Sequence, residues 1–288
     1  MCAVSTLLYA HDYDILVVYI LFTRKVKRMN RRKIILRVVL SICILAVIAF
    51  AAAFVRELYI DGQSRSFYSD LSARVETRPD GSGLAASDNA QPQHPEDTDD
   101  VWSPYVDFDA LNLIYPGIVA WIKLEGSVLD YPVMQYTDNE RFMTHLPDGT
   151  RHRSGSIFLD YRNNSDFSDN SILIYGHETR NHDMFGVLKN YRNQEFYDDN
   201  PVIYLYTPQQ DYKIVLFAGH LAHSQRDHPP LQFKDDEEFL KYAEHLKKIS
   251  LFMSDAQVSA GDRIVSLCTC AYDFDEARLV IVGVLVES

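Results

Sequence analysis

An uncharged apolar run, Val38 to Val55, constrains this chain more than any other feature of its sequence. It is eighteen residues long, and Ile34 to Leu36 lengthen it enough for one tilted transmembrane helix. Seven basic residues lie just before Ile34 and few follow Val55, so the positive-inside rule predicts a cytoplasmic N-terminus with the bulk of the chain outside. A cleaved signal peptide is the alternative, which the small residues Ala51 to Ala53 leave open.

The segments on either side of this run differ in composition. Met29 begins a basic tip followed directly by the apolar run, so residues 1–28 are expected to come from a mis-assigned start site. Pro79 to Thr98 is rich in Pro, Gly, Ser, Asn and Asp, as is typical of a flexible linker. We therefore expect a cytoplasmic N-terminus over residues 1–33, a transmembrane helix over 34–55, a stalk and flexible linker over 56–100, and an extracellular folded domain over 101–288.

Charge and cysteine content exclude several classes of protein. Residues 1–60 hold nine of the 28 Lys and Arg but three of the 40 Asp and Glu, so the remainder is strongly acidic and unsuited to nucleic acid. Of the four cysteines, Cys2 precedes the apolar run and Cys43 lies inside it. Only Cys268 and Cys270 remain for the folded part, too few for a disulfide framework or for a zinc site of two Cys pairs.

The pattern of the folded part predicts a mostly β domain. About eight short apolar segments are separated by Gly, Pro and polar turns, and they favour a closed or nearly closed β-barrel with peripheral helices. Asp235 to Ser250 is the clearest helix, with apolar residues at i, i+3 and i+4, acids in its first turn and lysines in its last. The strands are expected at 118–124, 129–135, 151–160, 171–175, 202–207, 212–220, 263–269 and 278–286, and two shorter helices at 108–115 and 184–191.

The last two predicted strands carry the chemistry. Cys270 follows the first of them and Arg278 begins the second, so a thiol and a permanent cation are expected at the same end of two neighbouring strands. A thiol nucleophile also needs an acid or base, and His177, directly after the strand 171–175, is the best candidate. Two other interpretations stay open at this point: both Cys268 and Cys270 are core residues, or they form a redox pair.

Other polar groups suggest weaker alternatives. His220, His223 and His228 could indicate a metal site, but they lack the helical HExxH arrangement and a clear fourth ligand. Asp273 and Asp275 could orient His177 or Arg278, although an exposed acidic turn explains them equally. We expect neither a metal nor a cofactor.

The segment SLCTCAYDFDEARLVIVG, together with ILIYGHETRNHDMFGVL, resembles the sortases, and specifically class B sortases. That family has TLxTC at the nucleophile, with an Arg downstream and a His upstream. Leu267, Thr269 and Cys270 match the motif, and Ser266 replaces its first Thr while keeping a hydroxyl. The similarity covers nearly all of residues 105–286, including the helix that class B members insert between two strands.

The resemblance implies a sortase barrel and a cysteine transpeptidase of Gram-positive bacteria. Cys270 would attack a Thr carbonyl in the C-terminal sorting motif of an exported protein, and a peptidoglycan-precursor amine would resolve the thioacyl intermediate. His177 would transfer protons and Arg278 would stabilise the oxyanion, with Ser266 and Thr269 as candidate substrate-binding residues. The alternatives are a cysteine peptidase that transfers the acyl group to water, and an extracellular binding module in which Cys270 is structural.

Overall fold

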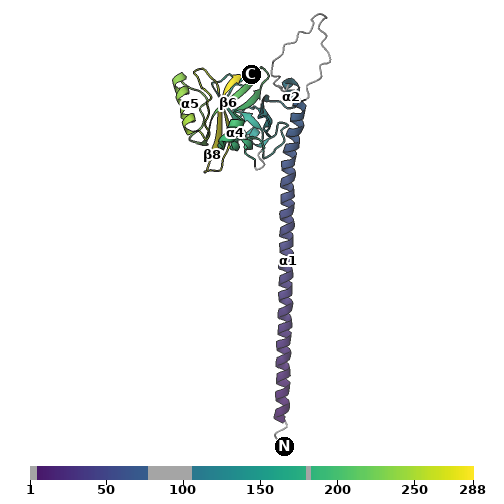
Figure 1. Ribbon diagram of the computed structural model, residues 1–288. Coiled ribbons are helices and arrows are strands. Elements are labelled where there is room, and N and C mark those ends of the chain that lie inside the picture. The colour runs from purple at the N-terminus through teal and green to yellow at the C-terminus, as the bar shows by residue number, and fades with distance from the viewer. Residues whose placement is uncertain (1–4, 77–105, 180–182) are drawn as a thin grey trace. The chain divides into compact units, whose positions relative to one another are not determined.

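The chain folds as a long N-terminal helix and an eight-stranded closed barrel (Figure 1). The computed structural model describes residues 5–76, 106–179 and 183–288, with side chains described from residue 31. The chain divides into two compact units, Met1–Gly62 and Gln63–Ser288. The expected linker Pro79 to Thr98 lies outside the described residues.

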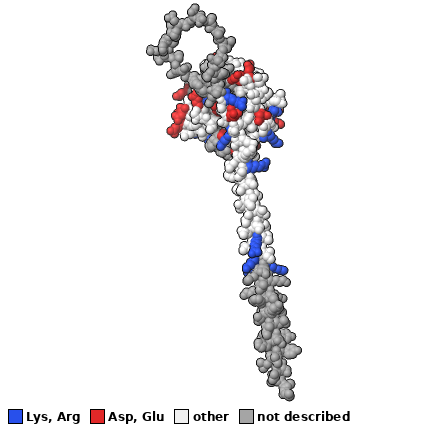
Figure 2. All heavy atoms as spheres, turned by 90° about the vertical axis from the view of Figure 1, so that its right-hand side faces the viewer, with Lys and Arg blue, Asp and Glu red and all other residues white. Residues whose placement is uncertain are grey.

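The first unit consists of most of helix α1 (Ser5–Glu76). Its large apolar side chains from Ile34 to Val55 are exposed to the surroundings. Within the described residues, Arg31–Val75 contains the stretch that is long and apolar enough to cross a membrane. Figure 2 shows this stretch as an uncharged section of the helix with basic side chains at its start. The helix is therefore consistent with a membrane anchor or a signal sequence.

The second unit is built on the barrel, in the strand order β1-β2-β3-β4-β7-β8-β6-β5. The pairs β2–β3 and β4–β7 are parallel, and the other neighbours are antiparallel. The strands are β1 (Ile118–Lys123), β2 (Asp130–Met134), β3 (Ile157–Leu159), β4 (Ser171–Tyr175), β5 (Val202–Tyr206), β6 (Asp211–His223), β7 (Ile264–Cys270) and β8 (Ala277–Glu287). The expected barrel is thus confirmed.

Helices surround the barrel. They are α2 (Phe108–Ile114), α3 (Arg141–Thr144), the 3-10 helix η1 (Phe185–Arg192), α4 (Gln194–Asp199) and α5 (Asp236–Ile249). Asp235 caps α5 by accepting a hydrogen bond from the backbone N–H of Glu238, 2.9 Å away. The buried α5 side chains Phe239, Ala243 and Leu246 pack with β6 and β8 residues in one apolar cluster. The acids and lysines of its two ends follow the helix dipole, as expected.

The compact unit begins earlier in the sequence than residue 101, where the folded domain was expected to start. The C-terminal end of α1 buries Tyr68, Leu71 and Val75, and Leu71 and Val75 share an apolar cluster with α2 and β1 residues. The Tyr68 hydroxyl also donates a hydrogen bond to the Gly155 carbonyl oxygen at 2.9 Å. Part of the segment assigned to a stalk therefore belongs to the packed core of this unit.

Candidate active site

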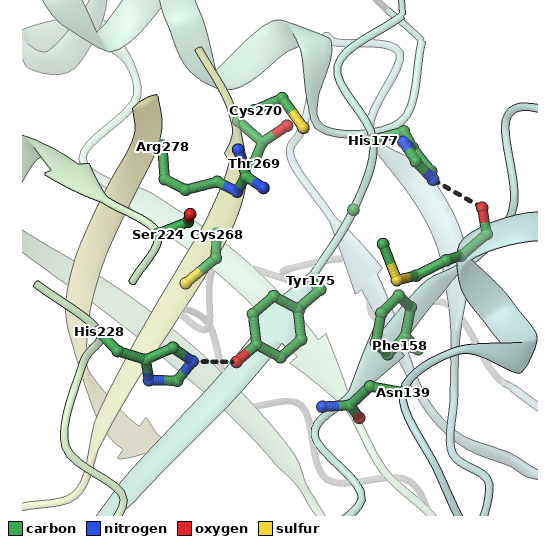
Figure 3. A pocket seen from close by; sticks show the side chains of 12 residues that line it. Asn139, Phe158, Tyr175, His177, Ser224, His228, Cys268, Thr269, Cys270 and Arg278 are labelled. Carbon is green, nitrogen blue, oxygen red and sulfur yellow. Dashed lines mark hydrogen bonds between the residues drawn. The ribbon is translucent and has the colours of Figure 1, made fainter. Parts of the chain in front are cut away.

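Three neighbouring strands bring the predicted catalytic residues to one end of the barrel. In the antiparallel pair β7–β8, Cys270 lies opposite Arg278. In the parallel pair β4–β7, Tyr175 lies opposite Cys268, and the Gly176 N–H donates to the Cys268 carbonyl at 3.1 Å. His177 follows this last hydrogen bond directly, so the three residues leave the sheet at the same level. All three line one cavity of about 260 Å³ (Figure 3).

The two cysteines of β7 differ in their surroundings although both side chains lie on one face of the strand. Cys270, at the strand end, is half-buried, whereas Cys268 is 5% exposed. Burial raises the pKa of the Cys268 thiol to about 12, against the opposing influence of the Arg278 cation. Cys268 is therefore a neutral thiol near neutral pH, and Cys270 is the one with access to solvent.

His177 is held by the backbone carbonyl of Met143, which also lines the cavity. Its Nε2 lies 2.7 Å from the Met143 oxygen, and Figure 3 shows the ring turned toward that atom. A carbonyl oxygen only accepts hydrogen bonds, so Nε2 carries a proton and, in the neutral ring, Nδ1 carries the lone pair. The Met143 contact thus leaves Nδ1 as the basic nitrogen of the imidazole.

The turn between β7 and β8 positions Arg278. The arginine donates to the Ala277 carbonyl at 3.0 Å and lies 4.0 Å from the Glu276 carboxylate. Glu276 has a φ of 61°, a left-handed conformation that residues other than glycine seldom adopt. Its backbone carbonyl and its carboxylate accept hydrogen bonds from Ser224, at 2.9 and 2.6 Å. The turn is therefore tied to the end of β6, close to the guanidinium.

A buried carboxylate supports the wall of the cavity. Asp160 is fully buried and lies within hydrogen-bond distance of Arg162, Asn139 and the Tyr175 hydroxyl, at 2.8, 3.0 and 3.2 Å. Burial alone would raise the pKa of Asp160, but the hydrogen bonds from Arg162 and Asn139 outweigh it and lower the pKa to about 2. The Tyr175 hydroxyl also lies 3.0 Å from Nε2 of His228. This network fixes the Tyr175 ring at the end of the cavity away from Cys270 (Figure 3).

The two predicted substrate-binding residues lie in different places. Thr269 lines the cavity, and its buried hydroxyl is one of the few buried polar groups without a hydrogen-bond partner in the described part of the chain. Ser266 is fully buried between Leu173 of β4 and Val282 of β8. Its hydroxyl also has no partner there, and it does not line the cavity.

The other candidate groups are separated from each other. Within the described residues, no cluster of His, Cys, Asp and Glu could hold a metal ion. Burial lowers the pKa of His220 to about 4, whereas His228 contacts Tyr175 in the cavity. Asp273 forms a two-pronged ion pair with Arg192, at 2.8 and 2.6 Å, so it is the partner of neither His177 nor Arg278.

Sequence reasoning missed several residues that line the cavity, among them Asn139, Met143 and Tyr175. Met143 belongs to α3, a helix of four residues, which is too short to produce a periodic pattern. Tyr175 was placed correctly on its strand, but its hydrogen bonds depend on residues distant in sequence. Gly155 was the sequence feature that could have indicated this contact. It adopts a left-handed conformation, and a Cβ atom there would meet the carbonyl oxygen of Phe142 at 2.3 Å and that of Met143 at 2.7 Å, so only glycine lets the two segments come this close.

Comparisons with known proteins agree with this geometry. The chain is 27% identical over 259 residues to sortase B of Staphylococcus aureus, covering 89% of this chain and 99% of the relative. It is 32% identical over 171 residues to sortase B of Listeria monocytogenes, covering 59% and 70%. No protein-family model matches the chain.

Solved structures show the same fold. A Staphylococcus aureus sortase B–substrate complex superposes with a TM-score of 0.65 at 26% identity, covering 80% of this chain and 99% of that one. Clostridium perfringens sortase B gives 0.59 at 33% identity, covering 62% and 99%. The closed barrel and the similarity to these sortase B proteins define a cysteine transpeptidase. The chain belongs to the sortase B family.

Proposed function

We propose that this protein is a membrane-anchored sortase that joins exported proteins to the cell wall. It cleaves a C-terminal sorting motif after a Thr carbonyl and transfers the acyl group to an amine of a peptidoglycan precursor. The observation that carries the proposal is the register of β4, β7 and β8, which gathers a thiol, an imidazole and a guanidinium around one cavity. The substrate complex and the triglycine complex solved for related sortase B proteins support both substrate classes.

In the first half-reaction the Cys270 thiolate attacks the Thr carbonyl carbon. A C–S bond forms, the C–N bond of the peptide breaks, and the leaving amine takes a proton from the His177 imidazolium. The thioester then remains on Cys270. The exposed rim of the barrel suits this step because only a solvent-accessible thiolate can meet a peptide.

In the second half-reaction a neutral amine attacks the thioester carbonyl. The new C–N bond forms, the C–S bond breaks with its electron pair returning to the Cys270 sulfur, and His177 accepts the proton of the amine. The guanidinium of Arg278 stabilises the oxyanion in both tetrahedral intermediates without losing a proton. In this proposal Thr269 contacts the bound peptide. For Ser266, a substrate-binding role is supported by the sequence motif alone.

The layout of the chain serves the same function. We propose residues 1–33 as a cytoplasmic segment and residues 34–55 as the transmembrane helix. The catalytic unit then lies outside the membrane, close to both an exported protein and a lipid-linked precursor. A tether of this kind raises the effective concentration of the enzyme at its substrates.

An assay with and without an amine tests the proposal. The full-length protein in detergent micelles is incubated with a fluorogenic library of Thr-containing pentapeptides, and intact-mass spectrometry follows the enzyme. A sortase gives a thioester on Cys270 and, with added triglycine, an amide product. Hydrolysis that triglycine does not divert identifies a peptidase, and no cleavage of any peptide identifies a binding module.

A further inference from the structure

The C-terminal end of α1, residues 63–76, belongs to the same compact unit as the barrel and packs with α2 and β1 residues. Two of its side chains reach polar groups that are distant in the sequence. The Tyr68 hydroxyl donates a hydrogen bond to Gly155, and the Arg65 guanidinium pairs with Asp183. Each of these contacts leads to a segment that holds the predicted catalytic imidazole.

The first contact supports the carbonyl that binds the imidazole. The Tyr68 hydroxyl is buried and lies 2.9 Å from the Gly155 carbonyl oxygen. Gly155 packs so closely against α3 that a Cβ atom there would meet the Met143 carbonyl oxygen at 2.7 Å. The same Met143 oxygen lies 2.7 Å from Nε2 of His177 (Figure 3). Tyr68 is thus connected to the imidazole ring through Gly155 and Met143.

The second contact supports the chain that follows the imidazole. Arg65 donates through Nε to the Asp183 carboxylate at 2.8 Å, and the two side chains are 52% and 22% exposed. The chain just after Asp183 is tied back to the imidazole by a β-bridge and by the Phe185 N–H, which donates to the His177 carbonyl at 3.1 Å. Arg65 therefore holds the segment that fixes the backbone of His177.

We propose that residues 63–76 of α1 form a positioning element of the active site, in which Tyr68 and Arg65 hold His177 in the orientation that proton transfer needs. This inference rests on the proposed transpeptidase function. Tyr68 acts through the carbonyl that binds Nε2, and Arg65 acts through the backbone next to the ring. Both side chains are described, and neither lines the cavity, so they are positioning residues.

Proton transfer depends strongly on geometry. His177 has to come within hydrogen-bond distance of the leaving amine and then of the attacking amine. A displacement of about 1 Å, caused by a change remote from the reaction, can lower a rate by about 10²-fold. Peptide binding does not need the imidazole in the same way. Loss of positioning should therefore lower kcat and leave KM almost unchanged.

Substitutions in the full-length protein test the two contacts, with the best-cleaved pentapeptide as substrate. Tyr68→Phe removes the hydroxyl and keeps the ring, and it is expected to lower kcat about tenfold and to change KM less than about twofold. Arg65→Gln is expected to lower kcat about threefold, because its ion pair is partly exposed. Arg65→Lys keeps the charge and should recover most of this loss.

Two matched variants separate positioning from stability. Tyr191→Phe also removes a hydrogen bond from a buried tyrosine, here 2.9 Å from the Asn200 carbonyl oxygen. Arg74→Gln removes the exposed ion pair with Asp70 from the same end of α1. Both variants should change kcat less than about twofold. Tyr191→Phe should nevertheless lower the urea midpoint about as much as Tyr68→Phe does.

A double-mutant cycle shows whether the effect passes through the imidazole. The residual rate of thioester formation in His177→Ala, followed by intact-mass spectrometry in a single turnover, should not fall further when Tyr68→Phe is added. Arg65→Gln repeats the cycle at an exposed ion pair, without a change in the core.

Unchanged kcat in Tyr68→Phe overturns the inference. So does a loss that Tyr191→Phe shares, or a loss of equal size in the His177→Ala background, because the end of α1 would then act on the fold as a whole. A change in KM alone also overturns it, since the effect would lie in peptide binding. These outcomes leave the transpeptidase standing, whereas a wild-type protein that forms no thioester removes the proposed function and this inference together.

Discussion

Cys268 and Cys270 stand two residues apart on strand β7 and differ in their exposure and in their neighbours. Cys268 is 5% exposed and packs in one apolar cluster with Tyr175 and Tyr242; although it also lines the cavity, its raised pKa keeps it neutral. Cys270 lies at the rim, opposite Arg278 and open to the same cavity. The same side chain is thus inert or reactive according to its depth in the barrel, because burial penalises the thiolate. The position of Cys270 at the end of the strand therefore distinguishes it from Cys268, which has the same side chain.

Removing the rim thiol should have the largest effect. Cys270→Ala is expected to lower kcat/KM for peptide cleavage by at least about 10⁴-fold, because the acyl group then has no covalent acceptor. Steady-state fluorescence with the best-cleaved pentapeptide measures the loss. Cys43→Ala, an exposed cysteine of α1, is the matched control and should change the rate less than about twofold. Retained activity in Cys270→Ala would show that Cys270 is not the nucleophile and would contradict the contrast drawn between the two cysteines.

Removing the rim imidazole should have the next largest effect. His177→Ala is expected to reduce kcat by about 10³-fold, since proton transfer to the leaving amine is lost. The pH dependence of kcat/KM should lose the imidazole limb at the same time, a change that a purely structural role would not produce. His245→Ala, on the exposed face of α5, serves as the control. A variant with unchanged activity and an unchanged pH profile would exclude His177 as the acid–base group.

Replacing the guanidinium of Arg278 by another cation should lower the activity less than the two changes above. Arg278→Lys is expected to lower kcat by about 10²-fold, because an ammonium lacks the planar fork that binds an oxyanion. Single-turnover kinetics of thioester formation would locate the loss in the chemical step. Arg74→Lys, in an exposed ion pair with Asp70, controls for the substitution. Wild-type turnover in Arg278→Lys would limit the role of Arg278 to its charge.

Alkylation compares the two depths directly. In a Cys2→Ala, Cys43→Ala background, iodoacetamide at pH 8 should modify Cys270 at least about 100-fold faster than Cys268, because a thiol with a pKa near 12 supplies almost no thiolate at that pH. Peptide mass mapping over a time course measures both rates. Similar rates at the two positions would show that β7 opens readily at its end.

The hydrogen-bond network around Asp160 should contribute to the free energy of unfolding of the protein. The pKa of Asp160 is lowered in the folded state, so its contribution is present above the unfolded pKa near 4 and is lost as the pH falls toward 2. Asp160→Asn is expected to destabilise the protein by about 2 kcal/mol at pH 7 and to reduce the loss of stability between pH 4 and 2. Urea unfolding at several pH values measures this, with the exposed Asp70→Asn as control. A pH-independent difference would assign the stability to packing.

Much of this architecture follows from local sequence patterns. The strand Ser171–Tyr175 was predicted with its observed ends, and α5 to within one residue at each end, because strong apolar patterns and capping residues define them. The arrangement of Cys270, Arg278 and His177 at one level was also expected, since each follows or begins a strand. The sortase resemblance and the mostly β barrel were confirmed by the relatives and the strand order.

The parts that were not predicted depend on contacts between distant segments. Helices α3 and α4 are four and six residues long, and α4 begins at an Asn193 cap whose side chain accepts from the Glu195 N–H. The 184–191 helix forms as a 3-10 helix shifted by one residue, and β6 extends three residues beyond its expected end because β8 pairs along its full length. The hydrogen bond between His177 and Met143 joins two loops that no local pattern relates.

The parallel pairing of β4 with β7 also determines when activity can arise. Strand β4, which precedes His177, pairs with β7, a strand close to the C-terminus. Strand β7 in turn pairs with β8, the last strand of the chain. In a chain that is still being synthesised, the segment with His177 is complete well before Cys270 has been added. The barrel, and with it the cavity lined by His177, Cys270 and Arg278, is therefore complete only when the C-terminal strand is present.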